Sequence, residues 1–129
     1  MLNNKGQSLV LFVLILPVLL MILLMVVDIG KMVLLKQELD DINYIALDYS
    51  IEKMDELEIK QSIKEIINKN RKDIDTIDIK IENNKIAILL EDNIDGSLSL
   101  LDNIKLFRVK SSYVGYINEE NKKVIERDK

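Results

Sequence analysis

The order of hydrophobic and polar positions divides the chain into three parts. No charged residue occurs from Gly6 to Val27. The apolar positions then recur at spacings of three and four, as on one face of an α-helix. From Ile77, apolar and polar residues alternate, which is typical of half-buried β-strands. The pattern predicts an α+β fold: a long N-terminal helix, a second helix, and a small antiparallel sheet of about three strands.

The uncharged run is long enough to cross a membrane. Ser8 to Val27 is twenty residues, and a helix that rises about 1.5 Å per residue would span the roughly 30 Å hydrocarbon layer. A cleaved secretion signal, the alternative, has a shorter apolar core of about 7–15 residues followed by small residues, whereas this run ends in Val26, Val27 and Asp28. We therefore predict a transmembrane helix over residues 7–27, kinked at Pro17.

The helix is predicted to continue beyond the membrane over residues 28–54. One apolar stripe at helical spacing consists of Met32, Leu35, Leu39, Ile42, Ala46 and Tyr49. The stripe extends over fewer than three heptads, so packing on the chain's own sheet is favoured over a coiled coil with a partner helix.

Residues 55–129 are predicted to form an extracytoplasmic α+β domain. A helix is expected from Glu56 to Asn70, where Asp55 and Glu58 have the spacing of a capping box. Its apolar face consists of Ile59, Ile63, Ile66 and Ile67. The nearby cations Lys69, Arg71 and Lys72 are interpreted as residues that favour a helix C-terminus.

Two alternating isoleucine runs surround Asn83-Asn84 and predict a tight β-hairpin, because asparagine tolerates positive φ. The runs are Ile77, Ile79, Ile81 and then Ile86, Ile88, Leu90. A third strand is expected over 106–117, with Phe107, Val109, Tyr113 and Ile117 on one face. The charge-rich tail from Asn118 to Lys129 is predicted to be frayed.

Composition narrows the classes of function. The chain has no cysteine and no histidine, so it lacks a thiolate site and the commonest general base. A net charge of −4 and few aromatic residues argue against a nucleic-acid partner, which needs a basic face or stacking rings. We expect neither an enzyme nor a cofactor.

One acidic segment has the spacing of a calcium loop. Oxygen-bearing side chains follow one another at Glu91, Asn93, Asp95, Ser99 and Asp102, with a glycine at Gly96. The first position of such a loop is normally aspartate and the last a bidentate glutamate, and here the two are exchanged. An Asp-Gly turn is the favoured interpretation, and calcium is kept as the alternative.

The N-terminal region resembles TadE-like minor pseudopilins of the tight-adherence branch of the type IV pilus machinery. The resemblance is carried by Lys5-Gly6-Gln7 and Phe12, by Pro17, and by Asp28 and Gly30 within Val27-Asp28-Ile29-Gly30-Lys31. It covers about the first 31 residues, a quarter of the chain. The charges on the two sides of the apolar run leave its orientation nearly undecided.

The resemblance implies a processed membrane protein. A prepilin peptidase would cut between Gly6 and Gln7, and residues 1–6 would be a short cytoplasmic leader. The protein would then cross the cytoplasmic membrane once, with its N-terminus inside and its C-terminal domain outside. Its partners would be other pilin or pseudopilin subunits and the pilus assembly platform, and its role would be the assembly or initiation of a pilus or related secretion apparatus.

The chain departs from the family pattern at Leu11, where the family has a glutamate that is thought to pair with the N-terminal amine of a neighbouring subunit. Leucine cannot form that pair. Two interpretations follow: a pseudopilin that does not need the pairing, as at a filament tip, or an unprocessed single-pass anchor that carries an extracytoplasmic binding domain.

Overall fold

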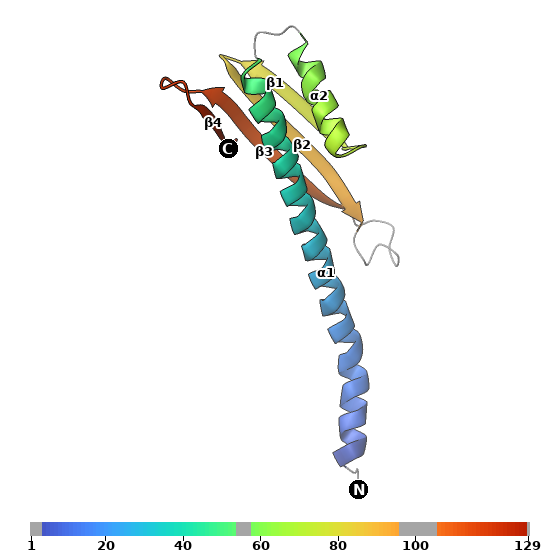
Figure 1. Cartoon of the computed structure of the whole chain (residues 1–129). Helices are drawn as coiled ribbons and strands as arrows, with labels where there is room; N and C mark the ends of the chain where they lie inside the picture. Colours follow the sequence, from blue (N-terminus) through green and yellow to red (C-terminus); the bar gives the residue numbers. More distant parts are fainter. Residues whose placement is uncertain (1–3, 54–57, 96–105, 129) are drawn as a thin grey trace.

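The chain folds into one very long helix, a shorter helix and a four-stranded sheet (Figure 1). A computed structural model describes residues 4–53, 58–95 and 106–128. The elements are α1 (Asn4–Ile51), α2 (Ile59–Asn70), β1 (Thr76–Glu82), β2 (Lys85–Asp95), β3 (Leu106–Ile117) and β4 (Lys123–Arg127). The predicted α+β class is confirmed, with four strands where about three were expected.

The sheet is an antiparallel meander in the order β1-β2-β3-β4. Asn83 and Asn84 connect β1 to β2 with φ values of 50° and 60°, the left-handed conformation that a two-residue hairpin requires. Ile81 pairs with Ile86 and Ile79 with Ile88, so both isoleucine runs face the same side. The predicted hairpin and the predicted bounds of the third strand are confirmed.

The prediction of a frayed tail is wrong, because residues 123–127 form β4 against β3. The turn between the two strands is held by Asn118, whose Oδ1 accepts hydrogen bonds from the backbone N–H groups of Glu120 and Lys122. Asn121 supplies a positive φ of 60°. Asparagine is suited to both roles, so a second asparagine-dependent hairpin extends the sheet.

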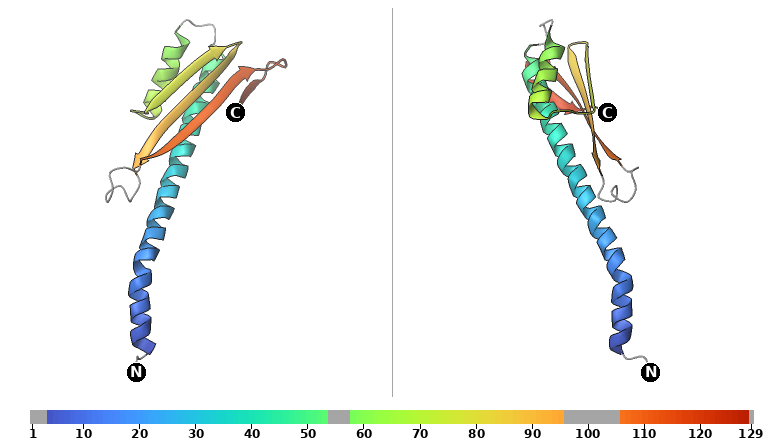
Figure 2. Two further views of the ribbon diagram at one scale, coloured as in Figure 1. Left: turned by 180° about the vertical axis from the view of Figure 1, so that it is seen from behind. Right: turned by 90° about the vertical axis from the view of Figure 1, so that its right-hand side faces the viewer.

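Both helices cover the same face of the sheet, and the two views in Figure 2 show the opposite face without a covering helix or strand among the described residues. The C-terminal half of α1 packs mainly on β3 and β2, and α2 packs beside α1. The predicted packing of the helix on the chain's own sheet is therefore confirmed. The buried core residues come from both helices and three strands: Leu35, Leu39, Ile42, Ala46, Leu47, Ile59, Ile63, Ile67, Ile79, Ile86, Ile88, Leu90 and Val109.

One member of the predicted stripe is misplaced. Tyr49 is exposed, while Asn43, Leu47 and Ser50 are buried. An α-helix drifts by about 20° per heptad relative to a strict seven-residue repeat, so the buried face passes to Asn43, Leu47 and Ser50 and leaves Tyr49 outside it. There the Tyr49 ring lies 4.2 Å from Lys53 Nζ, which also donates a hydrogen bond to the Tyr49 hydroxyl.

The start of α2 also differs from its prediction. The helix begins at Ile59, with Glu58 in the N-cap position and without a side-chain capping hydrogen bond. The predicted capping box is therefore wrong at Glu58, and its other member, Asp55, lies outside the described residues. The predicted apolar face is confirmed, since Ile59, Ile63 and Ile67 are buried.

Candidate functional site

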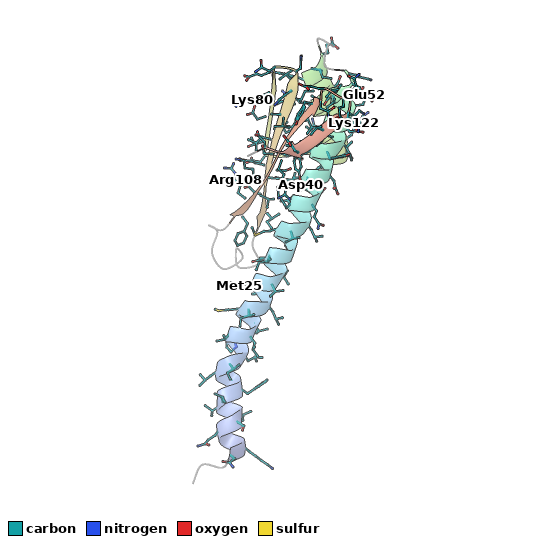
Figure 3. All side chains as sticks on the ribbon, turned by 90° about the vertical axis from the view of Figure 1, so that its left-hand side faces the viewer. Met25, Asp40, Glu52, Lys80, Arg108 and Lys122 are labelled. Carbon is teal, nitrogen blue, oxygen red and sulfur yellow. The ribbon has the colours of Figure 1, made fainter. Side chains whose placement is uncertain are left out.

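The N-terminal half of α1 carries the strongest functional signal. Its side chains point outward all around the helix, as Figure 3 shows at Met25, and no other described element packs on it. Nearly all of its large apolar residues are exposed. α1 is long and apolar enough to cross a membrane, with a mean hydropathy of 3.4 in its most apolar window. Exposed apolar surface on this scale is stable in lipid rather than in water.

Pro17 lies inside α1, which remains one continuous helix through this position. Proline removes a backbone donor and crowds the preceding turn, so it bends a helix without necessarily ending it. Figure 2 shows that the axis of α1 is bent rather than straight. A continuous but bent helix agrees with the predicted effect of this proline.

Gly6, Gln7, Leu11 and Phe12 all lie in the first turns of α1 and are exposed. A Cβ added at Gly6 would meet no heavy atom of the described residues within 4 Å. No packing contact with a described residue therefore explains the glycine. The backbone around Gly6 is open to an approaching protein, and the first N–H groups of a helix have no intrahelical partner.

Asp28 marks the end of the uncharged run, and it is buried. Only 5% of Asp28 is exposed, against 50% of Val27 and 57% of Ile29. It lies seven residues, or about two helical turns, before Leu35, which belongs to the core. Gly30 lies on the open side of the helix, where an added Cβ would meet nothing within 4 Å among the described residues. Asp28 is thus the first buried residue of α1, and it lies directly after the uncharged run.

These residues form a linear segment rather than a cleft. At about 1.5 Å per residue, Gly6 and Asp28 lie at opposite ends of the apolar part of the helix. Residues 6–42 match the sequence model of the TadE-like protein family. The N-terminal segment is TadE-like. No curated protein and no solved structure matches the chain.

The TadE-like match confirms the resemblance seen in the sequence and extends it past the membrane run to Ile42. It includes the motif positions named above from Gly6 to Gly30 and also Leu11, while Lys5 lies just outside it. It ends at Ile42, after the core part of α1 has begun at Leu35 and Leu39. The matched family is associated with the tight-adherence pilus and is structural rather than known as enzymatic.

The residues of the predicted calcium loop are separated by the structure. Glu91 and Asn93 lie on β2, where Glu91 forms an ion pair with Arg108 at 3.3 Å and Asn93 donates a hydrogen bond to Asp75. Asp95 ends the strand, and Ser99 and Asp102 lie outside the described residues. Within the described ranges, no three acidic side chains are grouped so that they could hold a metal ion. Calcium binding stays a prediction without support from the part that is described.

A clasp that the sequence did not reveal joins α1, α2 and β2. Arg71, just after α2, donates from Nε to Asp92 at 2.7 Å and from Nη1 to Glu38 at 2.8 Å. Asp92 is buried. The pKa of Arg71 is raised by its hydrogen bond to Asp92, against the effect of desolvation, with Glu38 as a further cause. Arg71 therefore connects the end of α2 to both α1 and β2.

Proposed function

We propose that the chain is a membrane-anchored minor pseudopilin that contributes to the assembly or initiation of a tight-adherence pilus or a related secretion apparatus. The observation that carries the proposal is the division of a single 48-residue helix. Its first half is apolar and exposed, and its second half is fixed on a small antiparallel sheet. The family match spans the junction between the two halves.

This division suits a subunit that is stored in a membrane and later packs against other subunits. The apolar half stays in lipid until assembly, and the sheet-packed half moves with it as one body. Because the two halves are one continuous helix, a pull on the domain is transmitted to the anchor. The work of such a protein is done by contacts, so no catalytic residue is required.

Processing between Gly6 and Gln7 completes the proposal. The prepilin peptidase would remove residues 1–6 on the cytoplasmic side, which orients the N-terminus inward and the sheet outward. Supporting observations are the open surroundings of Gly6 and its position in the first turn of α1, where unwinding costs few intrahelical hydrogen bonds.

The test is the N-terminus of the mature protein. The full chain is produced in membranes with and without a prepilin peptidase and then analysed by N-terminal sequencing and intact mass. We expect Gln7 as the first residue only when the peptidase is present. Gly6→Leu is expected to abolish the cleavage, while Gly30→Leu, at a second open helical glycine, is expected to preserve it. A mature protein that still begins at Met1 with active peptidase contradicts the processing and supports the unprocessed, anchored binding domain.

Leu11 fits a subunit at the filament tip, which has no subunit ahead of it to pair with. The number of copies per sheared filament measures this directly. We expect far fewer copies of this chain than of the major subunit. A copy number close to that of the major subunit contradicts the tip position but leaves the processing claim intact.

A further inference from the structure

The two helices that cover the sheet carry opposite charges. From Gln37 to Glu52, α1 has five carboxylates and neither lysine nor arginine. From Ile59 to Lys72, α2 and the two residues after it have five basic residues and one carboxylate, Glu65. The helices contact each other and run side by side in opposite directions (Figure 1). The side of the helix layer that faces away from the sheet is therefore acidic along α1 and basic along α2.

An exposed stripe of α1 forms the acidic half of this surface. It consists of Asp41, Ile45, Asp48 and Glu52, which are all exposed, and their spacings of four, three and four place them on one side of the helix. Lys123 lies 3.2 Å from Asp48 and 2.7 Å from Glu52, whereas Asp41 forms no ion pair with a described residue. Ile45, in the middle of the stripe, is 47% exposed. The stripe thus has more carboxylates than cations around an apolar centre.

A stripe of α2 forms the basic half. Lys60 and Lys64 are four residues apart and Arg71 follows seven residues later, so the three lie on one side of the helix. Arg71 Nη1 lies 2.8 Å from Glu38 of α1, which makes this the side of α2 next to α1. Lys60 and Lys64 are exposed, and neither forms an ion pair with a described residue. Two lysines therefore lie beside the acidic stripe without a partner carboxylate in the described part of the chain.

The two stripes also match in position along the helices. Lys64 lies seven residues before Arg71, and Ile45 lies seven residues after Glu38, about 10 Å from the ion pair along each helix at 1.5 Å per residue. Because the helices are antiparallel, Lys64 and Ile45 lie at the same level. The two aspartates of the acidic stripe are four residues before and three residues after Ile45, about 6 Å and 4.5 Å from that level.

A two-fold rotation about an axis parallel to the helices and between them would exchange the two stripes. It would place the basic stripe of one copy on the acidic stripe of another, and the same contact would occur twice, as in every isologous dimer. The apolar halves of both α1 helices would point in the same direction, so both could enter one membrane. A two-fold axis perpendicular to this surface would instead direct the two anchors to opposite sides.

We propose that the chain forms a parallel homodimer through the outer side of α1 and α2. Lys64 of each copy would lie between Asp41 and Asp48 of the other. The exposed side chains of Ile45 and Tyr49 would lie near the axis and be removed from water. The inference rests on the anchor part of the proposed function, because a shared membrane selects the parallel arrangement, and it adds a second copy as a partner. A different acidic or basic protein would complement one stripe, whereas a second copy complements both.

Native mass spectrometry of the full chain in neutral detergent measures the oligomeric state, and we expect wild type to be a dimer. Asp41→Lys and Lys64→Glu are each expected to weaken dimerisation on the order of tenfold, because each brings like charges together at two symmetric contacts. The variant that combines both substitutions has the net charge of wild type and is expected to recover most of the dimer. Lys80→Glu, at an exposed position of β1, is expected to leave the dimer unchanged.

Cross-linking in membranes tests the position of the axis. The chain has no cysteine, so a single introduced thiol reports on one place. Ile45→Cys is expected to give a covalent dimer with a short bifunctional thiol reagent. Ile117→Cys is the matched control, because Ile117 is 45% exposed but lies at the end of β3, and we expect it to stay monomeric in the same reaction.

Three outcomes overturn the dimer: a wild type that is monomeric at every concentration, a combined variant no better than Asp41→Lys alone, and equal cross-linking of the two cysteine variants. The cleavage test at Gly6 is independent of them. A chain that is cleaved normally but is monomeric contradicts this inference alone, and a dimer that is never cleaved contradicts only the processing.

Discussion

Gly115 of β3 lies so close to Ile51 of α1 that a Cβ built on the glycine would stand 2.8 Å from Ile51 Cδ1. The same Cβ would lie 3.2 Å from Leu47 Cδ2. Side-chain carbons do not approach this closely without displacement. The last turns of α1 therefore rest directly on the backbone of β3, and the absence of a side chain at Gly115 permits it.

We predict that Gly115→Ala destabilises the domain by about 1–3 kcal/mol, the usual cost of adding carbon to a packed core. The measurement is chemical unfolding of the full chain in detergent, followed by circular dichroism. Gly30→Ala is the matched control, because its added Cβ meets open space among the described residues and alanine favours a helix over glycine by about 0.5–1 kcal/mol. Equal effects of the two substitutions would show that Gly115 is not a packing constraint.

The elements predicted correctly from sequence are those whose conformation is determined by residues close together in the chain. The apolar run, the isoleucine alternation and the Asn83-Asn84 turn each specify a conformation within a few residues. The inner face of β3 was only partly predicted, because it contains Ser111 and Gly115 at buried positions. Small residues occur there because α1 crosses the strand, and a crossing between distant segments leaves no periodic signal.

The candidate site divides in the same way. The membrane segment and its motif positions can be recognised in the sequence because lipid imposes length and polarity on consecutive residues. The clasp of Arg71 depends on partners that lie 21 and 33 positions away in the sequence. In sequence Arg71 looks like an ordinary surface residue, since nothing local identifies the two carboxylates that it contacts.

Removal of the Arg71 clasp is predicted to destabilise the domain. Arg71→Met keeps an apolar stem but leaves the carboxylate of Asp92 buried without its cation, at a cost of about 1–3 kcal/mol. Urea unfolding of the full chain measures the loss, and Lys72→Met, at the next, exposed position, is the control. Because the pKa of Arg71 is raised, its contribution is fully present below the usual arginine value, and we expect the difference to be constant from pH 7 to pH 10. Arg71→Met as stable as Lys72→Met would contradict the clasp.

We predict that the ion pairs of Lys123 stabilise the fold at neutral pH and are lost at alkaline pH. Its Nζ lies 2.7 Å from Glu52 Oε1 and 3.2 Å from Asp48 Oδ1, so it ties β4 to the end of α1. The pKa of Lys123 is raised above 10.5, chiefly by the hydrogen bond to Glu52. A raised pKa means that the folded state binds the proton more tightly, so the stabilisation is complete below 10.5 and is lost as pH rises through the folded value.

The comparison of wild type with Lys123→Gln between pH 8 and pH 12 tests this sign. We expect wild type to melt at a higher temperature at pH 8 and the two melting temperatures to converge as the pH rises above 10.5, with the gap reduced by salt. Lys80→Gln, an exposed lysine on β1, controls for general alkaline effects. A gap that stays constant or widens with pH would rule out the ion pair as its origin.

Asn43 and Ser111 are predicted to be energetically coupled across the interface between α1 and the sheet. Asn43 Nδ2 donates to the carbonyl of Ile88 at 3.0 Å and lies 3.3 Å from both the carbonyl and Oγ of Ser111. Ser111 Oγ in turn donates to Asp40 at 2.6 Å. Both side chains are fully buried, so removal of either one deletes a buried hydrogen bond between them. Asn43 Nδ2 then keeps the Ile88 carbonyl, and Ser111 Oγ keeps Asp40.

A double-mutant cycle of Asn43→Ala and Ser111→Ala in the full chain measures that coupling. We expect each single variant to lose about 1–3 kcal/mol of unfolding free energy, and the double variant to lose less than their sum by at least about 0.5 kcal/mol. Ser112→Ala replaces Ser111→Ala in the control cycle, because adjacent strand residues point to opposite faces of the sheet. If Asn43→Ala is additive with Ser112→Ala but coupled to Ser111→Ala, the contact between Asn43 and Ser111 fixes the register of α1 on β3. Additivity in both cycles would leave that register to apolar packing alone.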